Sequence, residues 1–109
     1  MDAPEDRRDL PGISARAAET VADELSSLVG RVVVIDTRSP YVFLGRLQEV
    51  RPTFAVLRDT DAHDLRETTT TREAYVLEAV RHGVNVNRSE VWVRWDEVVA
   101  VSKLDDVVP

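Results

Sequence analysis

The stretch Tyr41-Val42-Phe43-Leu44-Gly45-Arg46-Leu47 decides the fold of this chain. Apolar and aromatic residues dominate it and indicate a β-strand, which we expect to run from Tyr41 to Val50. Gly45 lies inside this run, and a residue without a Cβ atom lets a strand curl sharply or lets another backbone approach closely. The sequence therefore predicts a strongly bent strand at the centre of a curled sheet.

Four more strands are predicted around this central one. Turn residues at 37–40 and the strand-breaking Pro52 separate the first three predicted strands. Only residues 95 and 96 separate the last two. Short strands with such tight connections favour a strongly bent small barrel over an open sheet. The expected strands besides 41–50 cover residues 31–36, 53–58, 90–94 and 97–102.

Two helices complete the predicted architecture, which is mainly β with helices. Apolar residues at three- and four-residue spacing indicate an amphipathic N-terminal helix from Ser14 to Val29, with Ser14 as its N-cap and Gly30 as its stop. The polar excursion 59–87, between the third and fourth strands, is longer than a barrel needs. It contains a second helix signal.

The second helix is predicted over residues 72–82. Thr70 with Glu73 three residues later matches a capping box, and Gly83 matches a helix stop signal. The expected domain organisation is therefore an acidic flexible tail at 1–12, one barrel domain at 13–105 that includes the excursion, and a short tail at 106–109.

Composition restricts the possible functions. The 109 residues carry a formal charge of −6, and 43% of them are hydrophobic, 19 of these being Val. Thirteen of the 14 basic residues are Arg. The absence of cysteine excludes disulfides and thiolate zinc sites. No run approaches the roughly 20 apolar residues of a membrane span, so we expect a soluble, cytoplasmic protein.

Three segments together resemble the Sm-like (LSm/Hfq-type) family of small barrels. They are Leu28 to Val34 and Tyr41 to Leu47, which resemble the first Sm motif, and Val93 to Val101, which resembles the second. The resemblance covers roughly residues 14 to 104. It implies a five-stranded, strongly bent Sm-like/SH3-like barrel, a ring of six or seven copies and RNA as a candidate partner.

The positions where this family binds RNA are largely replaced here. The resemblance places Arg51 at the family's acidic position, Thr53 at its aromatic or His position, and Ala55 at its uracil-binding Asn. The basic residue of the second motif is kept as Arg94, while Trp95 replaces the following Gly. The candidate RNA-binding residues are Arg94, Trp95, Arg51 and Thr53.

Self-association is expected at the edges of the barrel, because an unpaired strand edge invites pairing with another chain. The resemblance implies that the fourth strand pairs with the fifth strand of a neighbouring copy, as in a homo-oligomeric ring. The expected interface residues in these two strands are Val91, Trp92, Val93, Val98, Val99 and Val101.

Two functional classes stay open at this point. Arg94 and the neighbouring Trp side chains can stack on nucleobases, or the Trp side chains can belong to the core or to a subunit interface. The arginines at 31, 38, 46, 51 and 58 can bind phosphates, or form structural ion pairs. The hypotheses are an RNA-binding module or RNA chaperone, and a scaffold that binds proteins without RNA.

The motifs of enzymes and metal proteins are not found in this sequence. The run Asp59-x-Asp61-x-His63-Asp64 lacks the glycine and the distal Glu of a calcium loop. No Ser lies in a nucleophile-elbow pattern, and the four glycines form no phosphate-binding loop. We therefore expect no catalysis, no metal and no cofactor.

Overall fold

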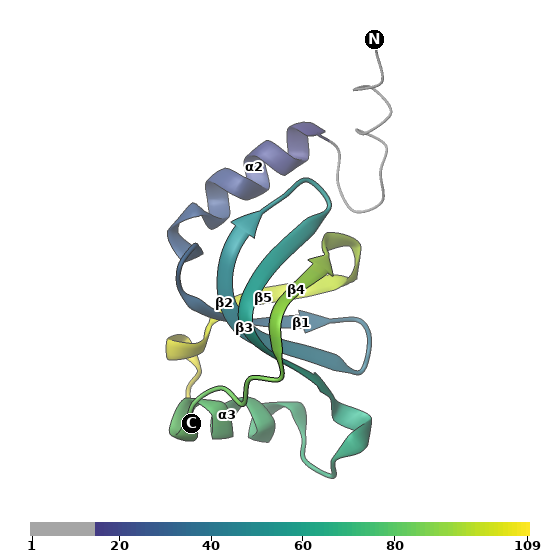
Figure 1. The fold of residues 1–109 in the computed structure, drawn as a ribbon, viewed down its shortest axis with the longest axis vertical. Coiled ribbons are helices and arrows are strands. Elements are labelled where there is room, and N and C mark those ends of the chain that lie inside the picture. Colours follow the sequence, from purple (N-terminus) through teal and green to yellow (C-terminus); the bar gives the residue numbers. More distant parts are fainter. Residues whose placement is uncertain (1–14) are drawn as a thin grey trace.

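The computed structural model describes residues 15–109 (Figure 1). The chain enters with helix α2 (Ala15–Leu25), which continues into a 3₁₀ turn, Ser26–Leu28. Gly30 follows with a φ of 89°, a left-handed conformation that favours glycine, so it ends the helical segment as predicted.

The expected acidic tail at 1–12 and the expected N-cap Ser14 lie outside the described residues. The C-terminal segment is described: a 3₁₀ turn, Leu104–Asp106, follows the last strand, and Val107 packs against apolar residues of the domain.

Five antiparallel strands form one strongly bent sheet in the order β4-β3-β2-β1-β5. This arrangement confirms the predicted fold class, with an N-terminal helix and an extra helix between the third and fourth strands. The two edges of the sheet are β4 and β5, which are consecutive in sequence. The strands are β1 (Val32–Thr37), β2 (Tyr41–Val50), β3 (Phe54–Asp64), β4 (Arg88–Arg94) and β5 (Val98–Lys103).

The bend of the sheet is centred on Gly45, as predicted. The register of the β2–β3 pair shifts between Leu44 and Arg46, on either side of this glycine. An ideal Cβ atom on Gly45 would lie 2.4 Å from Oγ1 of Thr60 on β3, which is a distance that real Cβ atoms do not adopt. Glycine is therefore needed here because β3 approaches too closely for any side chain.

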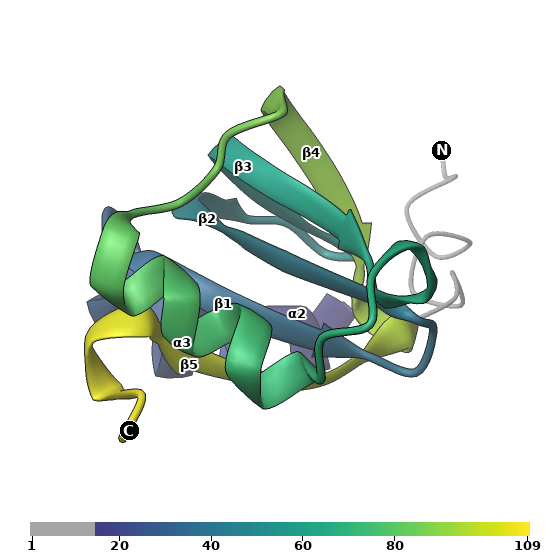
Figure 2. The same ribbon diagram turned by 90° about the horizontal axis from the view of Figure 1, so that it is seen from below.

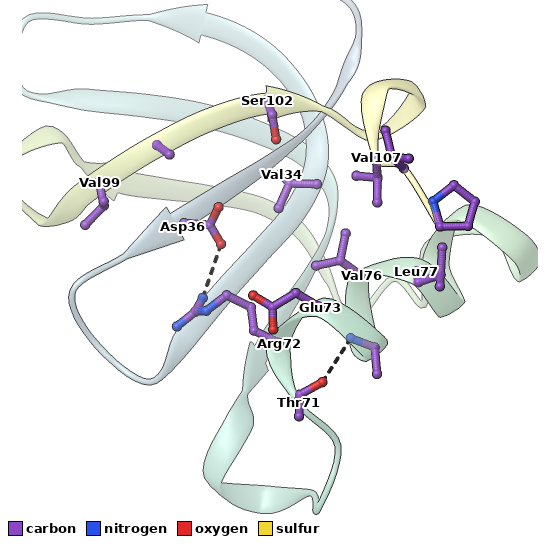
Figure 3. Close-up of a pocket in the computed structure, with 14 residues that line it drawn as sticks. Val34, Asp36, Thr71, Arg72, Glu73, Val76, Leu77, Val99, Ser102 and Val107 are labelled. Atoms are coloured by element: carbon purple, nitrogen blue, oxygen red, sulfur yellow. Dashed lines mark hydrogen bonds and ion pairs between the residues drawn. The ribbon is translucent and has the colours of Figure 1, made fainter.

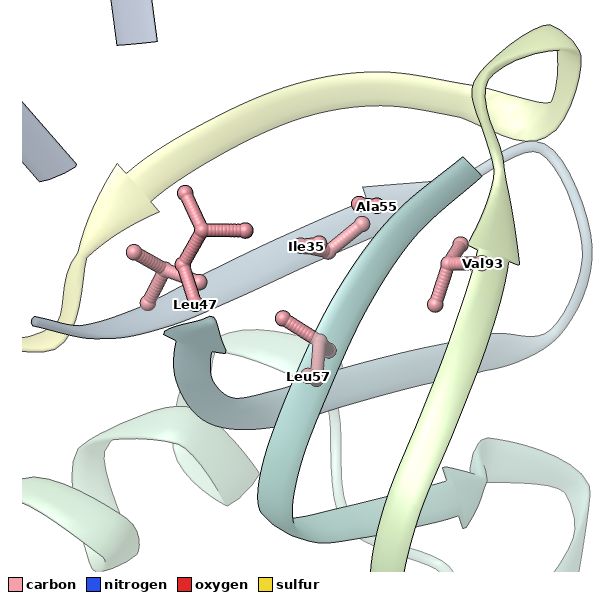
Figure 4. Packing of buried hydrophobic residues seen from close by; sticks show 6 residues of the cluster. Ile35, Leu47, Ala55, Leu57 and Val93 are labelled. Atoms are coloured by element: carbon pink, nitrogen blue, oxygen red, sulfur yellow. The ribbon is translucent and has the colours of Figure 1, made fainter. Parts of the chain in front are cut away.

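The inner face of the sheet holds the first of two apolar clusters (Figure 4). We call it the inner core, and Leu28, Val91, Trp95, Val98 and Val101 pack against it. Alternation along β1 places Val33 and Ile35 on this face. The buried members of the inner core are Val33, Ile35, Leu47, Ala55, Leu57 and Val93.

The outer face of the same strands is covered by the second helix, α3 (Arg72–His82), which forms an outer core with them. Figure 2 shows α3 lying along the sheet beside β1 and the C-terminal segment. Strand β1 is thus buried on both faces, which accounts for its continuous apolar sequence. The buried members of the outer core are Val34, Val42, Leu44, Val76, Ala79 and Leu104.

Two details of the long excursion differ from the prediction. The third strand does not end near Arg58 but continues to Asp64, because residues 61–64 pair with residues 41–44 of β2. The N-cap of α3 is Thr71 rather than Thr70, since Thr71 Oγ1 accepts a hydrogen bond from Ala74 N at 3.2 Å. Gly83 ends α3 with a φ of 89°, as predicted.

Candidate functional site

Two tight turns lie side by side and bring the predicted RNA-binding residues together. The β2–β3 turn is closed by a hydrogen bond from Arg51 N to Phe54 O at 2.9 Å. Trp95, directly after β4, donates its backbone N–H to Thr53 O at 3.0 Å and its indole N–H to Arg51 O at 2.9 Å. Arg94 precedes Trp95, so all four residues belong to one turn cluster, which we define as residues 51–53 and 94–96.

The charge of Arg94 is matched inside the turn cluster. Its Nε and Nη2 atoms donate to the two carboxylate oxygens of Asp96 at 3.0 and 2.7 Å. These hydrogen bonds raise the pKa of Arg94 and lower the pKa of Asp96. A phosphate group that binds Arg94 must therefore compete with a bidentate carboxylate.

Trp95 is half-buried and packs against the inner core rather than standing free in solvent. Its indole N–H is already used by the Arg51 carbonyl. This position favours a structural role for Trp95 in the core, where its ring joins the two turns, over stacking on nucleobases. Thr53 contributes its backbone carbonyl to the same link.

The second tryptophan, Trp92, has a different environment on the outer face of β4. Its indole N–H donates to Glu90 Oε2 at 2.7 Å, and the Phe54 ring meets its ring edge-on with centroids 5.7 Å apart. The guanidinium carbon of Arg51 lies 4.9 Å from the centre of the Trp92 ring. The hydrogen bond from Trp92, together with Arg58, lowers the pKa of Glu90. Trp92 is held on three sides yet remains 46% exposed.

Seven arginine side chains within the described residues are paired with carboxylates. Arg51 lies 3.5 Å from Glu49, and Arg46 instead donates to Gly30 O at 2.6 Å. This distribution agrees with structural ion pairs rather than with a phosphate-binding surface. The seven pairs within residues 15–109 are Arg31–Asp105, Arg51–Glu49, Arg58–Glu90, Arg66–Asp64, Arg72–Asp36, Arg81–Glu78 and Arg94–Asp96.

The predicted interface residues fall into three groups by exposure. Trp92 and Val99 are 46% and 66% exposed on the two edge strands. Val93, by contrast, is only 4% exposed and belongs to the inner core. The remaining three, Val91, Val98 and Val101, are half-buried against that core.

A groove of about 710 Å³ runs between α3 and the unpaired edge of β5 (Figure 3). We call it the α3–β5 groove. Sequence reasoning did not find it, because it depends on where α3 packs. One end carries Glu73 and the ion pair between Arg72 and Asp36, at 3.4 Å. Apolar side chains line much of the remainder, namely Val34, Val76, Leu77, Val99, Val107 and Val108.

A buried polar cluster, also missed in the sequence, joins β3 to α3 and to the segment before β4. Asp61 is 2% exposed and accepts hydrogen bonds from the Tyr75 hydroxyl and from Asn87 Nδ2. The His63 ring stacks on Tyr75 with centroids 3.7 Å apart. Burial, and then the hydrogen bond to Asp61, raise the pKa of Tyr75. The cluster attaches α3 to the sheet.

Within the part of the chain that the structure describes, no set of three carboxylate or imidazole side chains is placed to hold a metal ion. Across residues 15–109, no helix has the length and apolar character needed to cross a membrane.

Comparison with solved structures finds archaeal Sm proteins. An Sm protein of Pyrococcus abyssii, solved in complex with a uridine heptamer, is 19% identical, with 74% of this chain and 93% of that chain covered and a TM-score of 0.49. A heptameric archaeal Sm protein is 21% identical, with coverages of 80% and 98% and a TM-score of 0.47.

A third solved structure of this kind is the SmAP1 heptamer of P. aerophilum. It is 21% identical, covers 83% of this chain and 95% of its own, and has a TM-score of 0.48. No protein-family model and no curated protein matches the chain. The similar structures carry the name of the family that the sequence motifs resemble.

Proposed function

We propose that this protein is a self-assembling scaffold in which β4 of one copy pairs with β5 of the next. The observation that carries this proposal is that β4 and β5 are the two edges of one continuous sheet. Each edge strand has a row of backbone N–H and C=O groups on its outer side, and such a row is a template for pairing with another chain. Exposed apolar side chains on both edges, Trp92 and Val99, support the same conclusion.

The two edges are different surfaces, so a contact between them is head-to-tail. Repetition of a head-to-tail contact gives a closed ring when the rotation between neighbours allows closure. The resemblance of the sequence motifs to Sm-like proteins adds an expected size of six or seven copies.

Light scattering on a size-exclusion column tests the assembly directly. The chain mass is 12.2 kDa, and we expect a particle of six or seven times this mass at micromolar concentration. Val99→Lys places a charge on the β5 edge and should shift the particle toward a monomer. Val86→Lys is the matched control, because Val86 is 51% exposed outside the strands. A wild-type monomer would contradict the proposal.

The charge pattern supports a scaffold that binds proteins rather than polyanions. Nucleic-acid affinity depends mainly on neutralising phosphates with free basic groups. The arginines of the turn cluster are instead opposed by Glu49 and Asp96, and the chain carries a net charge of −6. We infer no catalytic role for this scaffold.

RNA binding is the second candidate function, and one observation favours it. The turn cluster holds Arg51, Thr53, Arg94 and Trp95 in contact across two turns. A fluorescence titration with oligo-U and oligo-A at low and physiological salt decides between the two. Submicromolar, salt-sensitive binding that Arg94→Ala abolishes supports RNA binding. No binding at low salt supports the protein scaffold.

A further inference from the structure

We propose that the α3–β5 groove receives the Trp92 side chain of the neighbouring copy, so that α3 is part of the subunit contact. This inference rests on the edge-to-edge assembly proposed above and adds a specific receptor site to it. The occupant is therefore a second copy of this chain, and the anchor is one aromatic side chain.

The groove opens on the side of β5 that has no strand partner. Ala100 pairs with Asp36 and Ser102 pairs with Val34, and all four residues line the groove. Paired residues in adjacent strands point to the same face of a sheet. The side chains of Ala100 and Ser102 thus lie on the face that α3 covers, next to the free edge.

Trp92 lies on the corresponding face of β4. Val91 and Val93 pack on the inner core, so alternation places Trp92 on the outer face. When β4 of one copy extends the sheet beyond β5 of another, an outer-face residue stays on the outer face. Trp92 then lies beside Ala100 and Ser102, at the opening of the groove.

The Trp92 side chain is already arranged as an anchor in the single chain. Its indole N–H is bound to Glu90, and Phe54 and Arg51 hold the ring from the sides. A side chain that is fixed before binding loses little conformational entropy when it binds. Exposed aromatic residues that enter apolar pockets are common anchors of protein interfaces. The part of Trp92 that remains exposed, 46%, is available to enter the groove.

Charge selects the direction of the incoming strand. Glu73 lies at the end of the groove near the start of β5, beside the ion pair between Arg72 and Asp36, so this end carries a net negative charge. An antiparallel β4 brings Arg94, two residues beyond Trp92, to this end, where Glu73 can share the guanidinium that Asp96 binds within the chain. A parallel β4 would bring Glu90 there and place like charges together. The antiparallel direction therefore places Trp92 at the opening of the groove and Arg94 near its negatively charged end.

Cross-linking tests the proposed contact, because the chain has no cysteine of its own. Trp92→Cys removes the aromatic anchor, so it is mixed with Leu77→Cys at a concentration well above that at which the assembly dissociates, where mild oxidation should give a disulfide-linked pair of chains. Val108→Cys is a second receiver, 84% exposed and so without effect on folding. Ser27→Cys, exposed in the 3₁₀ turn after α2, is the control and should give no link to Trp92→Cys.

A thermodynamic test separates the anchor from the backbone pairing. Trp92→Ala should raise the concentration at which the assembly dissociates at least tenfold, whereas Trp92→Phe should retain most of the affinity. A wild-type monomer overturns the edge-to-edge assembly itself. A wild-type oligomer that forms neither cross-link, and that Trp92→Ala leaves intact, overturns only the role of the groove.

Discussion

Gly45 of β2 and Thr60 of β3 approach each other so closely that a Cβ atom on Gly45 would lie 2.4 Å from Thr60 Oγ1. Gly45→Ala must therefore push the two strands apart at the bend. We expect the free energy of unfolding to fall by about 1–3 kcal/mol, as for other overpacked sites. Urea denaturation followed by circular dichroism measures this change.

The same substitution in a Thr60→Ala background is the control. Removing Oγ1 eliminates the closest contact but leaves the Thr60 Cβ position and Arg58 O at 3.0 and 3.1 Å. The decrease in the free energy of unfolding caused by Gly45→Ala should thus become smaller in this background without disappearing. An equal loss in both backgrounds would show that the contact with Thr60 Oγ1 is not its cause.

The bond between Tyr75 and Asp61 gives a second prediction. Tyr75→Phe keeps the ring that stacks on His63 but removes a donor from a carboxylate that is 2% exposed. We expect the free energy of unfolding to fall by roughly 1–3 kcal/mol. Tyr41→Phe, at a 37% exposed side chain, is the comparison and should change little.

The same residue makes stability sensitive to alkali. The raised pKa of Tyr75 means that the folded state keeps a proton that the unfolded chain releases near the ordinary value of 10.0. The contribution of the Tyr75 hydroxyl to the free energy of unfolding is complete below pH 10 and decreases as the pH rises above this value. The urea midpoint of Tyr75→Phe should therefore decrease less above pH 10 than that of the wild type.

The position of the α3 N-cap gives a third prediction. Thr71 Oγ1 accepts from Ala74 N, so Thr71→Ala should lower the free energy of unfolding by about 1 kcal/mol. Thr70→Ala is the matched control one residue earlier and should leave it unchanged. Thermal denaturation of the two variants compares them, and a larger effect at Thr70 would contradict the observed cap.

The pair formed by Asp64 and Arg66 gives a fourth prediction, on acid stability. Hydrogen bonds from the Arg66 side chain and backbone lower the pKa of Asp64 from 3.8 to about 2. A depressed folded-state pKa stabilises the protein above the unfolded value and loses this effect as pH falls through the folded value. The Tm difference between wild type and Asp64→Asn should thus be large at pH 6 and shrink between pH 4 and pH 2. A pH-independent difference would argue against this origin.

Local patterns were sufficient for most elements of the fold. A capping box and a glycine stop signal predicted α3 with its observed bounds, and the glycine within an apolar run predicted the bend in β2. The second half of β3 was missed because its polar residues look like a loop. Asp61 is buried there only because Tyr75 and Asn87, 14 and 26 residues later, supply its donors. No local pattern contains that information.

The candidate site was likewise predicted only in part from the sequence. The resemblance named Arg51, Thr53, Arg94 and Trp95, which the structure places in one cluster through backbone carbonyls. The carboxylate of Asp96 binds the guanidinium of Arg94, and this contact depends on the geometry of the turn after β4. The α3–β5 groove depends on the packing of α3 against β1, which sequence periodicity does not describe.

The two cores on opposite faces of β1 also determine how the molecule opens. Helix α3 is fixed to the sheet by side-chain packing and the Asp61 cluster, whereas β1 and β2 share backbone hydrogen bonds beneath both cores. Segments with fewer cooperative contacts exchange their amide hydrogens first. We therefore expect the amides of α3 to exchange before those of β1.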